Sequence, residues 1–241
     1  MSDPGRRHDE RDAKRKRVAA QALLQIWFSP AFPVGAFAYS HGLEAAVERG
    51  WIADRATLQS WLADLIAHGS LPNDLILLSA AWSAIVVSDT AQLIEIAELG
   101  AALQPSAERH LEATQQGHSF LDAITAAWPA DAPLPLDVLG DRGIIYAVAV
   151  GIAAAGHDIP IADTLRAYAI GFVGNLTSAG IRLSVIGQTD AQHIQAALLP
   201  SLIAQTERAE QATLDEIGGA AWRSDLASLI HETQYSRLFR S

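Results

Sequence analysis

The stretch Leu165–Val185, LRAYAIGFVGNLTSAGIRLSV, decides the fold class of this chain. Apolar residues recur along it at positions 165, 168, 169, 172 and 176, which is the spacing of one apolar face on a long helix. Leu58–Ile66 has the same spacing, and strand-like alternation is hard to find in the sequence. A chain of 241 residues is within the range of one domain. The sequence therefore predicts an all-α, single-domain helical bundle of roughly nine or ten helices.

Two other stretches, Leu75–Val87 and Gly143–Ala155, are apolar on nearly every side. Both are shorter than the roughly 20 residues that a membrane-spanning helix needs, so we expect no membrane segment. A helix without a polar face has to be covered all round, so we expect these two stretches to be buried against each other. Further helix starts are indicated at Asp89 and Thr189, because glutamine follows each of them three positions later.

Charge is unevenly distributed along the chain. Residues 1–17 hold seven Lys or Arg and four Asp or Glu, whereas the remaining residues hold ten basic and 23 acidic side chains. The basic stretch has no apolar segment behind it, so we expect a disordered lead-in over residues 1–17. The acidic remainder disfavours nucleic acid, because phosphate contacts need clustered basic residues and the only lysines are Lys14 and Lys16. We therefore expect the partner to be a protein or a cation.

The sequence lacks the motifs that would mark an enzyme or a metal centre. It has no cysteine, which excludes disulfides and thiolate metal sites and fits a cytoplasmic protein. It has no GxxxxGK[ST] loop, no HExxH motif and no GxSxG elbow. His41 with Glu44 and His193 with Asp190 have i, i+3 spacing, but such pairs are more often surface contacts than metal ligands. We expect no catalytic residue and no metal ligand, although carboxylates such as Glu112 can still meet across helices.

Three segments carry a resemblance to a known family. The first is SPAFPVGAFAYSHGLEAAVERGWI, residues 29–52, in which two prolines force an extended chain before a new helix. The second is GFVGNLTSAGIRLSVIGQTDAQHI, residues 171–194, and the third is the terminus HETQYSRLFRS, residues 231–241. In this order and at this spacing, the three segments resemble the UreF family of urease accessory proteins.

The resemblance implies a non-catalytic scaffold that bridges UreD, also called UreH, and the GTPase UreG during nickel insertion into apo-urease. It implies a homodimer without a cofactor of its own, because nickel is handled by the complex. We expect apolar faces left over on long helices to form the dimer interface, with Tyr168 and Phe172 as its candidates. The residues expected to bind partners are Pro33, Gly35, Tyr39, Ser40, Glu44, Tyr235, Arg237, Leu238, Phe239 and Arg240.

These expectations divide the chain into the lead-in 1–17, an all-α UreF-like domain over 18–230 and a C-terminal tail over 231–241. Terminal residues fray unless they are tied down, so we expect the tail to be mobile alone and to become ordered against Pro30–Gly42 when UreD binds. Two other classes stay open. A helical small-molecule-binding or regulatory protein would enclose a pocket, and a helical hydrolase would bring carboxylates together across the bundle.

Overall fold

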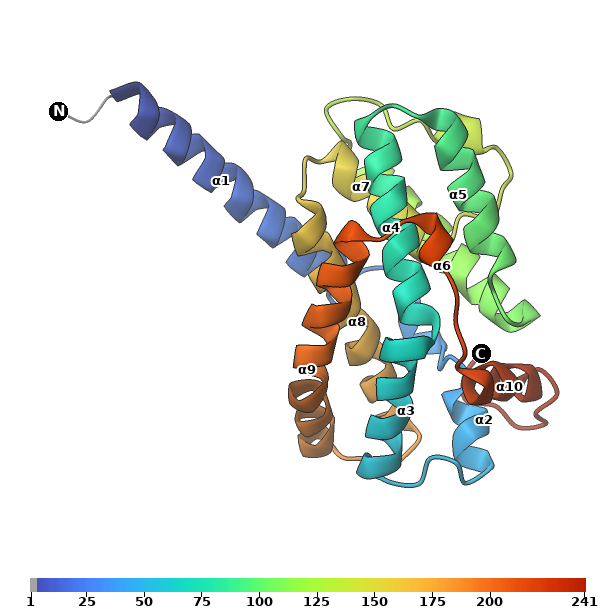
Figure 1. Ribbon diagram of the computed structural model, residues 1–241. Coiled ribbons are helices and arrows are strands. Elements are labelled where there is room, and N and C mark those ends of the chain that lie inside the picture. The colour runs from blue at the N-terminus through green and yellow to red at the C-terminus, as the bar shows by residue number, and fades with distance from the viewer. Residues whose placement is uncertain (1–3) are drawn as a thin grey trace.

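The computed structural model describes residues 4–241, and every regular element in that range is helical (Figure 1). The ten α-helices confirm the predicted all-α bundle and agree with the predicted number. Three further elements, labelled η, are short 3-10 helices. The order along the chain is α1 (Pro4–Trp27), η1 (Ala36–Ala38), α2 (Leu43–Glu48), α3 (Arg55–His68), α4 (Ser70–Val86), α5 (Thr90–Ala102), α6 (Ala107–Ala127), η2 (Leu136–Leu139), α7 (Tyr146–Gly156), α8 (Ile161–Arg182), α9 (Gln188–Gln211), η3 (Leu214–Glu216) and α10 (Trp222–His231).

Side-chain caps define several helix starts. The Asp54 carboxylate accepts the backbone N–H of Thr57 at 2.9 Å before α3, and Asp89 accepts that of Gln92 at 2.9 Å before α5. Each cap satisfies a backbone donor that the first turn of a helix leaves without a partner. The predicted start at Asp89 is therefore confirmed. Helix α9 instead begins at Gln188 after Gly187, so Thr189 lies inside its first turn.

Helix α7 packs against both α4 and α6 and is enclosed by the bundle. All residues from 147 to 155 are buried. A Cβ on Gly151 would lie 2.4 Å from the carbonyl oxygen of Leu78, so glycine lets α7 approach the backbone of α4. The two apolar stretches are thus buried against each other, as predicted. Among residues 4–241, no helix is both long enough and apolar enough to cross a membrane.

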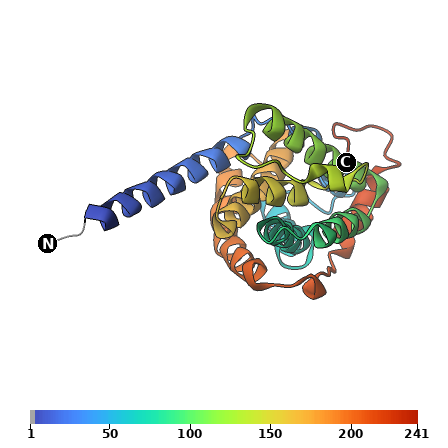
Figure 2. The same ribbon diagram turned by 90° about the horizontal axis from the view of Figure 1, so that it is seen from above.

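Helix α8 covers the stretch that decided the fold class, and it packs along α9 (Figure 1). Its buried face includes Leu165, Tyr168, Phe172 and Leu176, which confirms the predicted apolar stripe. Helices α3 and α4 follow one another along the length of the body in Figure 1. Seen from above, the helices form a closed body from which only α1 projects (Figure 2).

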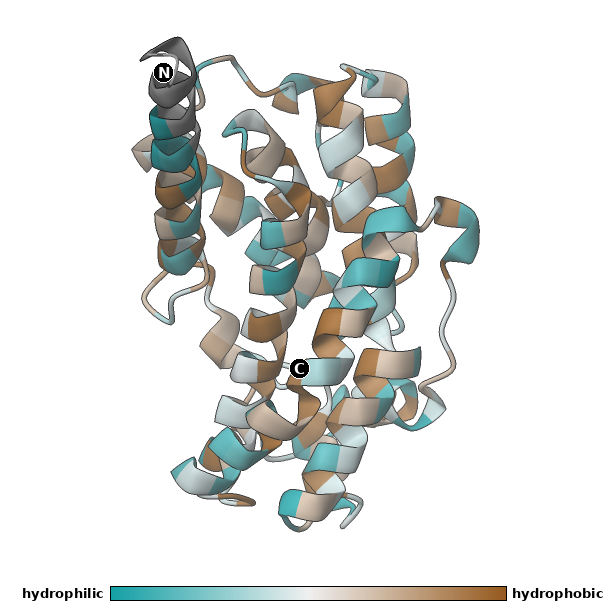
Figure 3. Ribbon diagram, turned by 60° about the vertical axis from the view of Figure 1, so that its left-hand side comes forward, coloured by the Kyte–Doolittle hydropathy of each residue, from teal (hydrophilic) through white to brown (hydrophobic). Residues whose placement is uncertain are grey.

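Helix α1 differs from the expected disordered lead-in. It runs from Pro4 to Trp27 without a break, and its outer part stands away from the body (Figure 2). The coloured turns of α1 in Figure 3 mix hydrophilic and hydrophobic residues, and the Arg, Lys and Glu residues in its sequence are good helix formers. Leu24 and Trp27 anchor the inner end, because both are buried in the core. Residues 1–3 of the predicted lead-in lie outside the described residues.

Candidate partner-binding site

The segment between α1 and α2 follows an irregular path that depends on positive φ angles. These angles are 72° at Gly35, 55° at His41 and 75° at Gly42. A Cβ on Gly42 would lie 2.8 Å from the backbone nitrogen of Ser228, so this glycine also lets α10 approach. Residues other than glycine rarely adopt positive φ, so His41 is held in this conformation by its surroundings. The path brings residues 38–41 alongside the C-terminal tail.

The C-terminal tail begins at residue 232 instead of 231, because His231 still belongs to α10, and residues 232–241 lie against this segment in the single chain. The backbone N–H of Arg240 donates to the carbonyl oxygen of Ala38 at 2.8 Å, and that of Ser40 donates to the carbonyl oxygen of Ser241 at 2.7 Å. Ser241 itself is buried. The tail therefore docks where the sequence predicted, but the chain's own contacts hold it. This differs from the expectation that UreD is needed to order it.

Glu44, in the first turn of α2, holds the tail through two contacts and the end of α10 through a third. It accepts the backbone N–H of Leu238 at 2.6 Å and that of Phe239 at 2.9 Å. One of its oxygens also lies 3.1 Å from Nε2 of His231. Hydrogen bonds to an ionised carboxylate are stronger than those between neutral groups. Glu44 is buried, and these contacts are with the tail and α10 of its own chain.

His231, the last residue of α10, is completely buried between two carboxylates. Its Nδ1 lies 2.6 Å from an oxygen of Glu108, and its Nε2 faces Glu44. Each ring nitrogen of His231 therefore faces a carboxylate oxygen. Arg237 adds a second donor to Glu108 at 2.5 Å. These contacts join α10, the start of α6 and α2.

Arg182, at the end of α8, connects the second family-like segment to the other two. Its guanidinium lies 4.3 Å from the centroid of the Phe239 ring, which is within the range of a cation–π contact. Its Nη1 also donates to the carbonyl oxygen of Phe37. The three segments singled out in the sequence therefore meet at one place.

A buried ion pair on α6, between Arg109 and Glu112, lies behind the tail. Nε2 of His41 lies 2.7 Å from Glu112, and the Ser241 hydroxyl donates to Glu112 at 2.5 Å. Burial raises the pKa of Glu112, but the charge of Arg109 and the contacts with His41 and Ser241 outweigh it and hold this pKa at about 2. Burial, followed by the charge of Arg109, lowers the pKa of His41. The last residue of the tail thus docks on an ionised carboxylate.

A cavity of about 650 Å³ lies beside this ion pair and is lined by α6, α7, α8 and the segment 28–37. Tyr168 and Phe172 form part of its wall and are buried, which differs from their expected place on a dimer surface. The Tyr168 hydroxyl donates to Asp74 at 3.0 Å, and burial raises the pKa of Asp74 from 3.8 to about 6. The exposed apolar residue of α8 is Ile170, which is 50% exposed.

The residues predicted to bind partners fall into two groups. One group is buried and supports the docked tail, and the other lies at the surface. Tyr39 belongs to the buried group, because its hydroxyl donates to the side chain of Gln115 inside the bundle. The buried group is Tyr39, Ser40, Glu44 and Phe239, the surface group is Pro33, Tyr235, Arg237, Leu238 and Arg240, and Gly35 is half-buried.

Sequence reasoning missed Arg109 and Gln116 of α6, and it named Glu112 only as a carboxylate that can meet others across helices. Arg109, Glu112 and Gln116 are buried on the helix that also carries the buried Phe120. Their spacing of i, i+3, i+7 and i+11 places all four on one helix face, and polar residues on the face that carries a core aromatic are the signal that was available. The involvement of Glu108, Asp74 and His231 had no local signal, because their partners lie on other helices.

Comparison with known proteins assigns the chain to a family. A model of the UreF family matches residues 52–199, more than half of the chain, so the chain belongs to the UreF family. It is 50% identical over 218 residues to the urease accessory protein UreF of Rhodopseudomonas palustris strain HaA2. These aligned residues cover 90% of this chain and 92% of that relative. The UreF of Methylobacterium radiotolerans is 48% identical over 224 residues, or 92% of this chain and 98% of the relative. The UreF of Bradyrhizobium diazoefficiens is 46% identical over 230 residues, or 95% of each chain.

Proposed function

We propose that this chain is a non-catalytic scaffold in the maturation of urease. In this role it bridges UreD, or UreH, and the GTPase UreG in the cytoplasm, so that nickel is inserted into apo-urease. Membership of the UreF family supports the general role. The observation that carries the scaffold role is an exposed apolar surface next to the docked tail.

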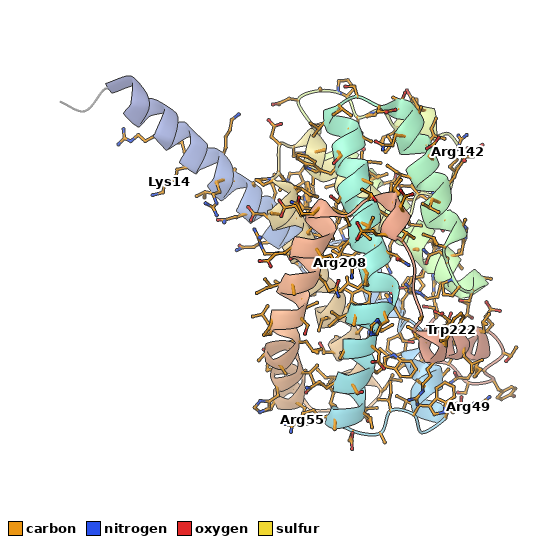
Figure 4. All side chains as sticks on the ribbon, viewed as in Figure 1. Lys14, Arg49, Arg55, Arg142, Arg208 and Trp222 are labelled. Carbon is orange, nitrogen blue, oxygen red and sulfur yellow. The ribbon has the colours of Figure 1, made fainter. Side chains whose placement is uncertain are left out.

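This docking surface consists of Trp222, Leu226 and Leu229 on α10 together with Tyr235 and Leu238 on the tail. The three α10 residues are spaced i, i+4 and i+7, so they lie on one helix face, and each is between 48% and 75% exposed. Figure 4 labels Trp222 at the start of α10. The other side of α10 packs on α2, so this face is available to another protein. Clustered exposed apolar side chains, aromatic ones above all, are typical of protein interfaces, and we assign this surface to UreD.

We also propose that the chain forms a homodimer through the outer face of α8. Ile170 lies between the buried Tyr168 and Phe172 in the sequence and is itself half exposed. Ile170→Glu should shift the dimer to monomer in light scattering, because a charge would then face the partner copy. A wild-type chain that is strictly monomeric at tens of micromolar would reject the dimer.

Nickel, in this proposal, is the cargo of the whole complex, and the chain needs no cofactor of its own. Calorimetric titration of the isolated protein with nickel should then show weak binding or none. A submicromolar one-to-one site in the free chain would contradict the pure scaffold role.

Co-purification tests the scaffold role itself. A tagged form of the chain, produced in cells that also make UreD, UreG and apo-urease, should capture UreD and UreG together. Urease activity in the same cells should depend on the chain. Capture of neither partner, with the chain folded and abundant, would reject the proposal.

A second candidate function, small-molecule binding, is favoured by one observation. The cavity of about 650 Å³ falls within the range of ligand pockets, which is roughly 300–1,000 Å³. This function is compatible with a scaffold, since the cavity and the docking surface share no residue.

A further inference from the structure

The cavity combines an apolar body with a polar end. Phe28, Tyr146 and Tyr168 pack together in its wall, with ring centroids 5.6 to 6.4 Å apart. Phe37 also lines the cavity and is exposed at the surface, so the cavity opens to solvent on its side. A ligand that enters there meets aromatic rings along its path.

Arg109 stands at the polar end of the cavity. It is 7% exposed and lines both this cavity and a smaller one of about 210 Å³. Within the part of the chain that the structure describes, only Nη1 of its guanidinium has a hydrogen-bond partner, which is Glu112. An arginine side chain offers five N–H donors in a rigid fork that suits the two oxygens of a carboxylate. Most of these donors therefore remain available at the boundary of the two cavities.

Asp74 controls the charge at this end. It lines both cavities with Arg109, and the charge of Arg109 acts on it. Glu112 already neutralises Arg109, so an ionised Asp74 would leave the site with a net negative charge and repel an anion. A neutral Asp74 removes this repulsion and can donate a hydrogen bond through its own O–H.

We propose that this cavity binds a small monocarboxylate with an apolar body. The carboxylate pairs with the free edge of the Arg109 guanidinium and with the neutral form of Asp74. The apolar body packs against Phe28, Tyr146 and Tyr168. This inference concerns a ligand of the chain itself and does not depend on the proposed role in urease maturation.

Three ligands that share one body and differ in the head group test the proposal. Calorimetry at about pH 5.5 compares 3-phenylpropanoate with 3-phenylpropanol and 3-phenylpropylammonium. The carboxylate should bind at least about tenfold more tightly than the alcohol, because its hydrogen bonds to Arg109 are charge-assisted. Equal affinity for acid and alcohol, tighter binding of the ammonium compound, or no binding of the acid would each overturn the proposal.

The pH dependence gives a second readout. Since burial raises the pKa of Asp74 to about 6, affinity for the carboxylate should fall by about 20-fold between about pH 5.5 and about pH 7.5, as the neutral fraction of Asp74 falls. The nearby Glu112 and Tyr168 stay in one form over this range, because the pKa of the first is about 2 and that of the second is raised by burial. The other ionisable side chains that line the two cavities are His41, His68, Tyr146 and Asp225.

Asp74→Asn separates the effect of Asp74 from the effects of these groups. Asparagine keeps a neutral side chain that donates a hydrogen bond, so the variant should bind the carboxylate at about pH 7.5 as tightly as the wild type does at about pH 5.5. Affinity that still falls with pH in this variant would overturn the role of Asp74.

A matched pair of glycine variants tests the cavity without touching its charges. Gly174 lines the cavity, and a Cβ there meets nothing within 4 Å, so Gly174→Leu should fill space and abolish binding while the protein stays folded. Gly187→Leu makes the same chemical change at a position that also has open space but does not line the cavity, and it should bind normally. Normal binding by folded Gly174→Leu would place the ligand elsewhere and reject the site.

Discussion

Nε2 of His231 lies 3.1 Å from a carboxylate oxygen of Glu44, although 187 positions separate the two residues in the sequence. The same carboxylate accepts the backbone N–H groups of Leu238 and Phe239. The carboxylate and the groups that donate to it are shielded from water. If one of them is removed, its partners lose a hydrogen bond that water cannot replace. Glu44 is therefore the residue on which the order of the tail depends most.

Glu44→Gln should loosen the tail. The glutamine amide has one oxygen that can accept a hydrogen bond. Its N–H₂ group would face a backbone N–H that needs an acceptor. The local free energy that holds the tail in place should therefore fall by about 2 kcal/mol. Hydrogen exchange of the amides of residues 238–240 should speed up accordingly. Glu48→Gln is the matched control, because Glu48 lies one turn further along α2 and is exposed. Unchanged protection in Glu44→Gln would show that other contacts hold the tail.

Asp74→Asn should stabilise the protein near neutral pH and have little effect in acid. The folded-state pKa of Asp74 is raised from 3.8 to about 6, so its contribution to stability is fully present below about pH 4 and is lost as pH rises through about 6. A pKa difference of about 2 corresponds to at most about 3 kcal/mol in the free energy of unfolding at pH 7.5. Urea denaturation at about pH 4 and pH 7.5 measures it, and Asp64→Asn, at an exposed position of α3, is the control. Equal effects of Asp74→Asn at both pH values would contradict the assignment.

Gly117→Ala should destabilise the protein by about 3 kcal/mol, because the backbone of Ile144 lies directly against α6 at this glycine. A Cβ there would lie 2.0 Å from the carbonyl oxygen of Ile144. This oxygen belongs to the backbone, so the clash can be relieved only if the chain itself moves. Gly174→Ala makes the same change where a Cβ meets nothing within 4 Å, and it should stabilise α8 by up to about 1 kcal/mol. Thermal unfolding of the two variants should therefore shift in opposite directions. A shift in the same direction would refute the close approach at Gly117.

The fold was predictable because its signal is local and repeated. The apolar spacing in Leu165–Val185 indicated a helix, and α8 runs over Ile161–Arg182. The cap at Asp89 was readable from two residues in one turn. The helical state of residues 4–17 was not predicted, since charge and the lack of an apolar face argued for disorder, whereas intrinsic helix propensity favours a helix there.

The site was only partly predictable, because its pairs are formed between distant helices. His41 and Glu44 have the i, i+3 spacing of neighbours on a helix, but α2 begins only at Leu43 and His41 has a positive φ. The two side chains therefore turn to different partners, Glu112 and His231. The resemblance located the segments that meet, but it did not show which of their residues are buried.

The docking surface can be tested separately from the docking of the tail. Tyr235 is fully exposed and Leu238 is 64% exposed, so changing both to alanine should leave the free energy of unfolding within about 0.5 kcal/mol of wild type. If UreD binds this surface, its affinity should fall about tenfold or more, because exposed aromatic and aliphatic anchors carry much of the energy of an interface. Titration of purified UreD against the folded variant measures this affinity.

Phe239→Ala and Val87→Ala complete the test. Phe239 is 4% exposed beneath Arg182, so its loss should speed hydrogen exchange in the tail and weaken UreD binding indirectly, by releasing the residues that flank it. Val87 is 68% exposed and follows the C-terminal end of α4, an end that lies away from the tail in Figure 1, so its loss should change neither readout. A direct role of Tyr235 and Leu238 thus requires weaker binding with the tail still protected from exchange. If their double variant binds UreD as tightly as the wild type does, then UreD docks on another surface of the chain.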